Sequence, residues 1–204
     1  MHQYAKLFGT ARIPTRDGCR IKTFGDSKHV VVMRRGQFYS FDIVMHMFSK
    51  KSHVQVMDSE HRPVLSEREL LVHISDIIRD ADRLPISKVA QSSIGLLTTE
   101  RRPTWAALRQ DLLEDPHSPN NEYLKVIDSA LFIVCLDNSS PRTADAICST
   151  MLCGTYELEG RRGVQVGTCL NRWYDKLQII VCADGQAGVN FEHSAVDGHT
   201  VLRF

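Results

Sequence analysis

The stretch LQIIVCADGQAGVNFE, residues 177–192, carries the clearest fold signal in the chain. Its first six residues, 177–182, form an apolar run rich in β-branched side chains, which predicts a buried strand. Asp184 and Gly185 form a dipeptide typical of a tight turn between antiparallel strands. Residues 188–192 predict the returning strand, so the stretch predicts an antiparallel pair of strands near the C-terminal end.

The residues before this pair predict alternating strands and helices. The predicted elements are, in chain order, a hairpin over 29–33 and 38–47, helices over 67–82, around 105–113, over 121–130 and over 143–152, and a strand over 131–136. Residues 50–63 and 84–97 read as loops, and residues 154–167 as irregular. Because this order is too irregular for repeated βαβ units, it predicts an α/β fold with a mixed sheet flanked by helices.

Two local patterns indicate where helices begin. Ser66 and Glu69 have the spacing of a capping box, in which the two side chains bond each other's backbone N–H groups. Thr98 or Thr99 is expected to cap the next helix, with Pro103 in its first turn.

Composition bounds the class of protein. The chain has 204 residues, 25 Lys and Arg against 24 Asp and Glu, and 43% hydrophobic residues. These values are typical of one globular domain or lobe and exclude a disordered or collagen-like chain. The net charge of +1 provides no basic face for nucleic acid. We also expect no transmembrane segment, because no apolar run approaches about 20 residues.

Metal and phosphate motifs are not found in the sequence. The six cysteines, which we expect to be buried and reduced, form no C-x-x-C pair and come with no visible signal peptide. The sequence contains no H-E-x-x-H, phosphate-binding glycine loop or G-x-S-x-G motif. We therefore expect no metal site and an intracellular protein.

One histidine stands in a position suited to catalysis. His193 follows the last predicted strand, and Asp197 and Gly198 come shortly after it. Imidazole titrates near neutral pH and suits general-base catalysis, with a nearby carboxylate orienting it or holding the turn. A histidine bonded to local backbone is equally compatible with this spacing. Four other histidines, at 46, 53, 61 and 117, are expected to be solvated, and His73 to pack on or lie at the surface of its helix.

Several blocks of the sequence, in the same order, resemble the choline/carnitine acyltransferase family. These blocks are LFGTARIP at 7–14, GLLT at 95–98 followed by Arg102, Trp105, Ala106 and Arg109, FIVCLD at 132–137, NRWYDK at 171–176, and FEHSAVDG at 191–198. Residues 167–176 and 181–204 are most similar to the carnitine acetyltransferases of fungi. The resemblance covers nearly the whole chain, which makes it more specific than any single motif.

The resemblance implies a fold, a reaction and a set of roles. The fold would be one lobe of the chloramphenicol acetyltransferase-like, CoA-dependent acyltransferases. The reaction would transfer a short acyl group, such as acetyl, between coenzyme A and the hydroxyl of carnitine, with acyl-CoA as co-substrate and no tightly bound cofactor. His193 would be the general base, Asp197 and Glu192 would support the catalytic turn, and the NRWYDK, R-x-x-W-A and FIVCLD blocks would form scaffold.

The resemblance also implies that residues 1–204 are a single lobe, truncated at both ends. Relatives have a second lobe that completes the active site, so we expect this chain alone to be nearly inactive. A choline-specific relative and a non-catalytic binding or assembly module remain alternatives. The family implies a cytoplasmic, mitochondrial or peroxisomal location.

Overall fold

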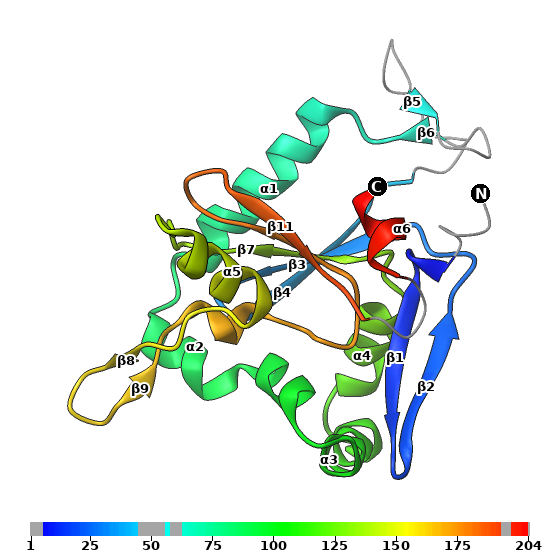
Figure 1. Ribbon diagram of the computed structural model, residues 1–204. Helices are drawn as coiled ribbons and strands as arrows, with labels where there is room; N and C mark the ends of the chain where they lie inside the picture. The colour runs from blue at the N-terminus through cyan, green and yellow to red at the C-terminus, as the bar shows by residue number, and fades with distance from the viewer. Residues whose placement is uncertain (1–5, 45–55, 58–62, 193–196, 204) are drawn as a thin grey trace.

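A five-stranded mixed sheet forms the centre of the protein (Figure 1). The computed structural model describes residues 6–44, 56–57, 63–192 and 197–203. The strand order is β11 (Ala187–Asn190), β10 (Gln178–Val181), β7 (Ile133–Leu136), β3 (His29–Arg34) and β4 (Gln37–Asp42). The three inner strands are parallel, whereas β11 and β4 run antiparallel to their neighbours at the two edges. The predicted α/β fold with a mixed sheet is confirmed.

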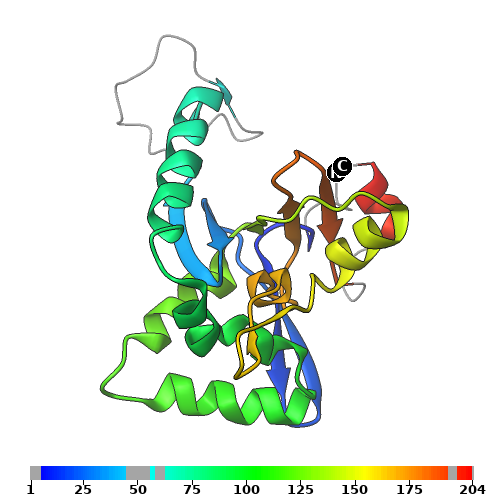
Figure 2. The same cartoon turned by 90° about the vertical axis from the view of Figure 1, so that its left-hand side faces the viewer.

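Helices cover both faces of this sheet (Figures 1 and 2). The helices are α1 (Glu67–Ala81), α2 (Ile86–Ser92), α3 (Arg102–Glu114), α4 (Asn120–Ser129), α5 (Ala144–Leu152) and α6 (Gly198–Leu202), with 3-10 turns η2 (Ile94–Thr99) and η3 (Thr168–Asn171). Trp105 of α3 and Ile127 of α4 join one buried cluster, and Ile77 of α1 joins the cluster on the other face. Because β3 is covered on both sides, Val30, Val31, Val32 and Met33 are all buried, which explains their continuous apolar run.

A second hairpin stands outside the central sheet. Strands β1 (Thr10–Thr15) and β2 (Gly18–Thr23), which are not among the elements predicted above, pair along their full length. Four shorter strands form two further pairs, β5 (Val56–Met57) with β6 (Pro63–Val64), and β8 (Leu158–Glu159) with β9 (Val164–Gln165). The β1–β2 hairpin is joined to the sheet region by hydrogen bonds from Gly9 N to Leu131 O and from Arg12 N to Asp175 O.

The predicted helices over 67–82, 121–130 and 143–152 are confirmed within a residue or two. Ser66 and Glu69 form the predicted capping box, and Thr143 caps α5. The predicted cap of α3 is wrong, because the helix begins at Arg102 and no side chain caps it. The Thr98 and Thr99 hydroxyls instead donate to Gly95 O and Leu96 O inside η2.

The predicted loop over 84–97 is also wrong, since it contains α2 and the start of η2. Tertiary packing explains these short turns, because Val89 is buried and Gly95 lies tightly against the NRWYDK block. A Cβ atom at Gly95 would come within 2.4 Å of Arg172 O, so this close approach requires glycine.

The hairpin over 29–33 and 38–47 is confirmed as β3 and β4, which ends at Asp42, and residues 45–47 lie outside the described part of the chain. The predicted turn at Asp184 and Gly185 separates β10 from β11. Strand β11 ends at Asn190, not at Glu192 as predicted. The Asn190 side chain joins this end of β11 to α5, because its Nδ2 donates to the last two carbonyls of that helix, those of Met151 and Leu152.

The expectation of six buried thiols is only partly correct. All six cysteines are free, and two are buried, Cys135 in β7 and Cys182 just after β10. Cys169 is half-buried, whereas Cys19, Cys148 and Cys153 are exposed. The exposed ones lie on the outer hairpin and at α5, away from the two buried clusters, which explains the error.

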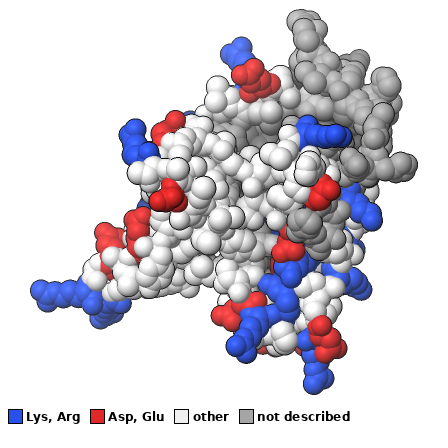
Figure 3. Space-filling model, in the orientation of Figure 1, with Lys and Arg blue, Asp and Glu red and all other residues white. Residues whose placement is uncertain are grey.

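Charged side chains of both signs share the surface (Figure 3). On the face shown, Lys and Arg lie beside Asp and Glu over the β1–β2 hairpin, and this face carries no broad area of one sign. This distribution matches the near-zero net charge of the sequence.

Candidate active site

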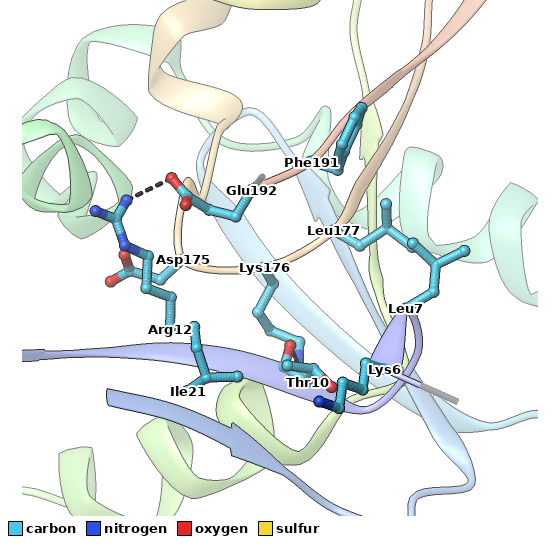
Figure 4. Close-up of a pocket in the computed structure, with 10 residues that line it drawn as sticks. All are labelled: Lys6, Leu7, Thr10, Arg12, Ile21, Asp175, Lys176, Leu177, Phe191 and Glu192. Atoms are coloured by element: carbon cyan, nitrogen blue, oxygen red, sulfur yellow. Dashed lines mark hydrogen bonds and ion pairs between the residues drawn. The ribbon is translucent and has the colours of Figure 1, made fainter. Parts of the chain in front are cut away.

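The end of β11 faces the β1–β2 hairpin across a small pocket (Figure 4). Glu192, two residues beyond the strand, points toward Arg12 of β1 and forms an ion pair with it. Phe191 lines the same pocket with Leu7 and Leu177. The pocket volume is about 30 Å³, enough for a single water molecule, so these walls alone do not enclose a substrate.

The three predicted site residues have different outcomes in the structure. His193 lies outside the described residues. Glu192 is held by Arg12 of the outer hairpin. Asp197 is the N-cap of α6, where its Oδ1 accepts hydrogen bonds from Thr200 N and Thr200 Oγ1, both at 2.8 Å. Glu192 and Asp197 are thus anchored to separate elements on either side of residue 193.

Asp175 lines the pocket and connects two of the sequence blocks. Its carboxylate accepts hydrogen bonds from Arg102 NH1 at 2.6 Å and from Trp105 Nε1 at 2.7 Å. Burial raises the pKa of the Asp175 carboxyl, although Trp105 and Arg102 favour its charged form. Trp105 also packs edge-on against Trp173, with ring centroids 5.9 Å apart. The R-x-x-W and NRWYDK blocks therefore pack as one unit.

A second buried ion pair joins NRWYDK to the FIVCLD block. Arg172 donates to both carboxylate oxygens of Asp137, at 2.9 and 2.7 Å, and to Thr150 O at 2.7 Å. Neither charged side chain of this pair is exposed. Asn171 Nδ2 donates to the same carboxylate at 3.1 Å. The structure thus agrees with a scaffold role for all three blocks.

Lys176 also lines the pocket and is buried beneath β1. Its Nζ donates to Thr10 O at 3.1 Å and to Asp128 O at 2.8 Å, and so joins β1 to the end of α4. Burial lowers the pKa of Lys176 from its ordinary 10.5 to about 7, against the opposing effect of the Asp128 carboxylate. A charged ammonium in this place reduces stability, and its two hydrogen bonds offset part of the cost.

A pH series tests the burial of Lys176. In the unfolded chain this lysine holds its proton up to a pKa near 10.5, whereas the folded chain releases it above a pKa of about 7. Because the unfolded state binds more protons between these values, we expect the stability of the natural chain relative to Lys176→Met to rise with pH, by at most about 1.4 kcal/mol per unit. Urea denaturation of both chains at several pH values in the lower half of this window measures the difference. A constant difference would show that the lysine keeps its ordinary pKa when folded.

Sequence reasoning found the blocks but missed two residues at the pocket. Arg12 lies in the LFGTARIP block, for which the resemblance implies no specific role, and Lys176 lies in the NRWYDK block, for which it implies a scaffold role. Alternation along a strand that includes Arg12 could have indicated that its side chain faces one side of the hairpin.

His73 lies away from this pocket, on the surface of α1. Its predicted packing or surface position is confirmed, since it is exposed and its ring stacks on Phe41 with centroids 4.6 Å apart.

A larger hollow of about 660 Å³ lies on the opposite edge of the sheet, between β4 and α4. Its lining includes Phe38, Tyr39 and Tyr123, and none of the predicted site residues.

The described residues show neither a metal site nor a membrane span. Within them, no group of three His, Cys, Asp or Glu side chains is placed to hold a metal ion. The described helices include none long and apolar enough to cross a membrane.

A mixed sheet flanked by helices, with the R-x-x-W, FIVCLD and NRWYDK blocks joined by buried hydrogen bonds, fits one lobe of a CoA-dependent acyltransferase. The family model described as choline/carnitine O-acyltransferase matches residues 1–204. The chain therefore belongs to the choline/carnitine O-acyltransferase family, as the sequence resemblance predicted.

Proteins with similar sequences are named as carnitine acyltransferases. The "Putative mitochondrial carnitine O-acetyltransferase" of Saccharomyces cerevisiae is 42% identical over 216 residues, which cover 100% of this chain and 29% of that protein. The "Carnitine O-palmitoyltransferase 2, mitochondrial" of Rattus norvegicus is 37% identical over 205 residues, which cover 100% of this chain and 26% of that protein. The same enzyme of Xenopus tropicalis is 35% identical, with 26% of its length covered. The chain spans less than a third of the length of these curated relatives.

Proposed function

We propose that this chain is the histidine-bearing lobe of an enzyme that transfers an acetyl or other short acyl group between coenzyme A and carnitine. The observation that carries the proposal is the family match over all 204 residues, which includes the segment Glu192 to Gly198. The titles of the three relatives support carnitine as the acceptor. They name both acetyl and palmitoyl transferases, and the higher identity of the acetyl one supports a short acyl group.

In the proposed reaction His193 acts as the general base. It removes the proton of the carnitine hydroxyl, and the resulting alkoxide attacks the thioester carbonyl of acyl-CoA. The carbon–sulfur bond then breaks, and His193 returns the proton to the coenzyme A thiolate, so that an acyl ester and free thiol are formed. Glu192 and Asp197 support the catalytic turn without taking a proton, a role for which their bonds to Arg12 and α6 provide support.

The substrates require more room than the pocket beside Glu192 provides. The pocket beside Glu192 has room for about one water, and the chain covers 29% of the yeast relative. We propose that a second lobe, outside the 204 residues, completes the site, and that the chain alone transfers acyl groups at close to the background rate. A mitochondrial location is supported by the titles of the relatives, with the cytoplasm and peroxisome as alternatives.

A substrate comparison tests the proposed function. Release of coenzyme A thiol is followed with a chromogenic reagent, using the longest natural polypeptide that contains this sequence. We expect kcat/KM to be about 10-fold to 100-fold higher for carnitine than for choline, because choline lacks the carboxylate that a charge-assisted hydrogen bond would hold. Acetyl-CoA is expected to exceed palmitoyl-CoA.

Each other outcome selects an alternative. A preference for choline would assign the chain to a choline acetyltransferase-like enzyme, and a preference for palmitoyl-CoA would overturn the short-chain assignment. No transfer to either acceptor would favour the non-catalytic binding or assembly module. Full activity of residues 1–204 alone would contradict the need for a second lobe.

A further inference from the structure

Arg12 is held on three sides at the point where β1 approaches the end of β11. Its backbone N–H donates to Asp175 O at 2.9 Å. Its Nε donates to Cys19 Sγ on the neighbouring strand at 3.0 Å. Its NH1 then bonds the Glu192 carboxylate, 180 residues away along the chain. The bonds to Asp175 and Cys19 therefore orient the guanidinium toward Glu192. The ion pair joins the β1–β2 hairpin to the residues that follow β11 (Figure 4).

We propose that Arg12 is a positioning residue for acyl transfer, acting through Glu192 on the residue that follows it. The inference rests on the proposed function, in which His193 is the base. Strand β11 ends at Asn190, so Phe191 and Glu192 lie beyond the ladder of the sheet. Consecutive Cα atoms are about 3.8 Å apart, and a bond that fixes Glu192 restricts where residue 193 begins.

The partial exposure of the Arg12–Glu192 ion pair indicates that it matters more for positioning the catalytic turn than for the stability of the fold. The Arg12 and Glu192 side chains are 27% and 34% exposed. Ion pairs with this degree of exposure contribute little to folding stability. A displacement of about 1 Å in a reacting group, by contrast, can reduce the rate about 100-fold. Removing Arg12 should therefore impair catalysis much more than stability.

A double-mutant cycle on the natural polypeptide tests this inference. We expect Arg12→Gln and Glu192→Gln each to lower kcat about 10-fold to 100-fold, with KM for both substrates and the melting temperature nearly unchanged. The double variant should resemble either single variant, because both remove the same bond. Arg12→Lys keeps the charge and should recover part of the lost kcat.

The matched control is Lys28→Met, which breaks the comparably exposed Lys28–Asp42 pair, whose N–O distance is 3.5 Å. This change should leave kcat as it is. A readout independent of catalysis comes from NMR of the 204-residue chain, in which Arg12→Gln should shift the amide signals of Glu192 and His193 and Lys28→Met should not.

Two results would overturn the role of Arg12. One is an Arg12→Gln variant with kcat and amide signals like those of the natural chain, and the other is additive losses in the double variant. Failure of the proposed function has a different signature, namely transfer activity that survives His193→Ala. The amide signals still decide whether Arg12 orders residues 192 and 193 in that case.

Discussion

Replacing His193 by alanine in the longest natural polypeptide that contains this sequence is expected to lower the proposed acyl transfer from acetyl-CoA to carnitine by about 100-fold to 10,000-fold, the usual contribution of a positioned general base. The carnitine hydroxyl is a very weak acid, so without a base its proton must leave during attack with water as the acceptor. In this variant Glu192 keeps its ion pair with Arg12, and Asp197 keeps its hydrogen bond from Thr200 N. The loss should therefore appear in kcat while the fold is retained. Thiol release from coenzyme A and the circular dichroism spectrum measure the two effects.

His117→Ala is the matched control, because His117 is an exposed histidine far along the chain from the candidate site. It should leave transfer unchanged. If His193→Ala retained more than a tenth of the natural rate, the base would have to be another group and the assignment would fail. Asp197→Asn should have a smaller effect than His193→Ala, since asparagine also caps helices well.

The family blocks could be identified from the sequence because each is a short run of neighbouring residues. The same holds for α1, whose capping box at Ser66 and Glu69 and apolar spacing are local. The buried strand β3 was also evident, because coverage on both faces leaves a continuous apolar run, Val30 to Met33.

The contacts that build the site could not be predicted in the same way. Arg12 and Glu192 are 180 residues apart, and Arg102 and Asp175 are 73 residues apart. No local pattern states which charged residues will meet, because the pairing is set by packing of the hairpin, α3 and the sheet. The short elements α2 and η2 were missed for a similar reason, since the burial of Val89 in α2 and the close approach of Gly95 in η2 to Arg172 depend on packing between distant parts of the chain.

Replacing Arg172 by methionine is expected to destabilise the fold by about 3–5 kcal/mol, because it leaves the buried Asp137 carboxylate without its cation. Asp137 is 3% exposed, and Arg172 is fully buried among Thr150 O, Thr168 O and Asn171 O. A loss of this size is a large share of the typical stability of a domain, about 5–15 kcal/mol. For a chain of this length it corresponds to a fall in melting temperature of roughly 6–20 °C. Urea denaturation followed by tryptophan fluorescence measures it.

A double variant distinguishes the effect of the buried charges of Arg172 and Asp137 from the effect of apolar packing around them. Arg172→Met combined with Asp137→Leu removes both charges, and we expect it to recover much of the loss, since the desolvation cost of the carboxylate disappears with it. Arg79→Met breaks the exposed Arg79–Asp76 pair, whose side chains are 67% and 59% exposed, and should change stability by less than about 0.5 kcal/mol. A loss in Arg172→Met no larger than that of Arg79→Met would mean that the three sequence blocks are held together by apolar packing around Trp105 and Trp173, with the ion pair contributing nothing net.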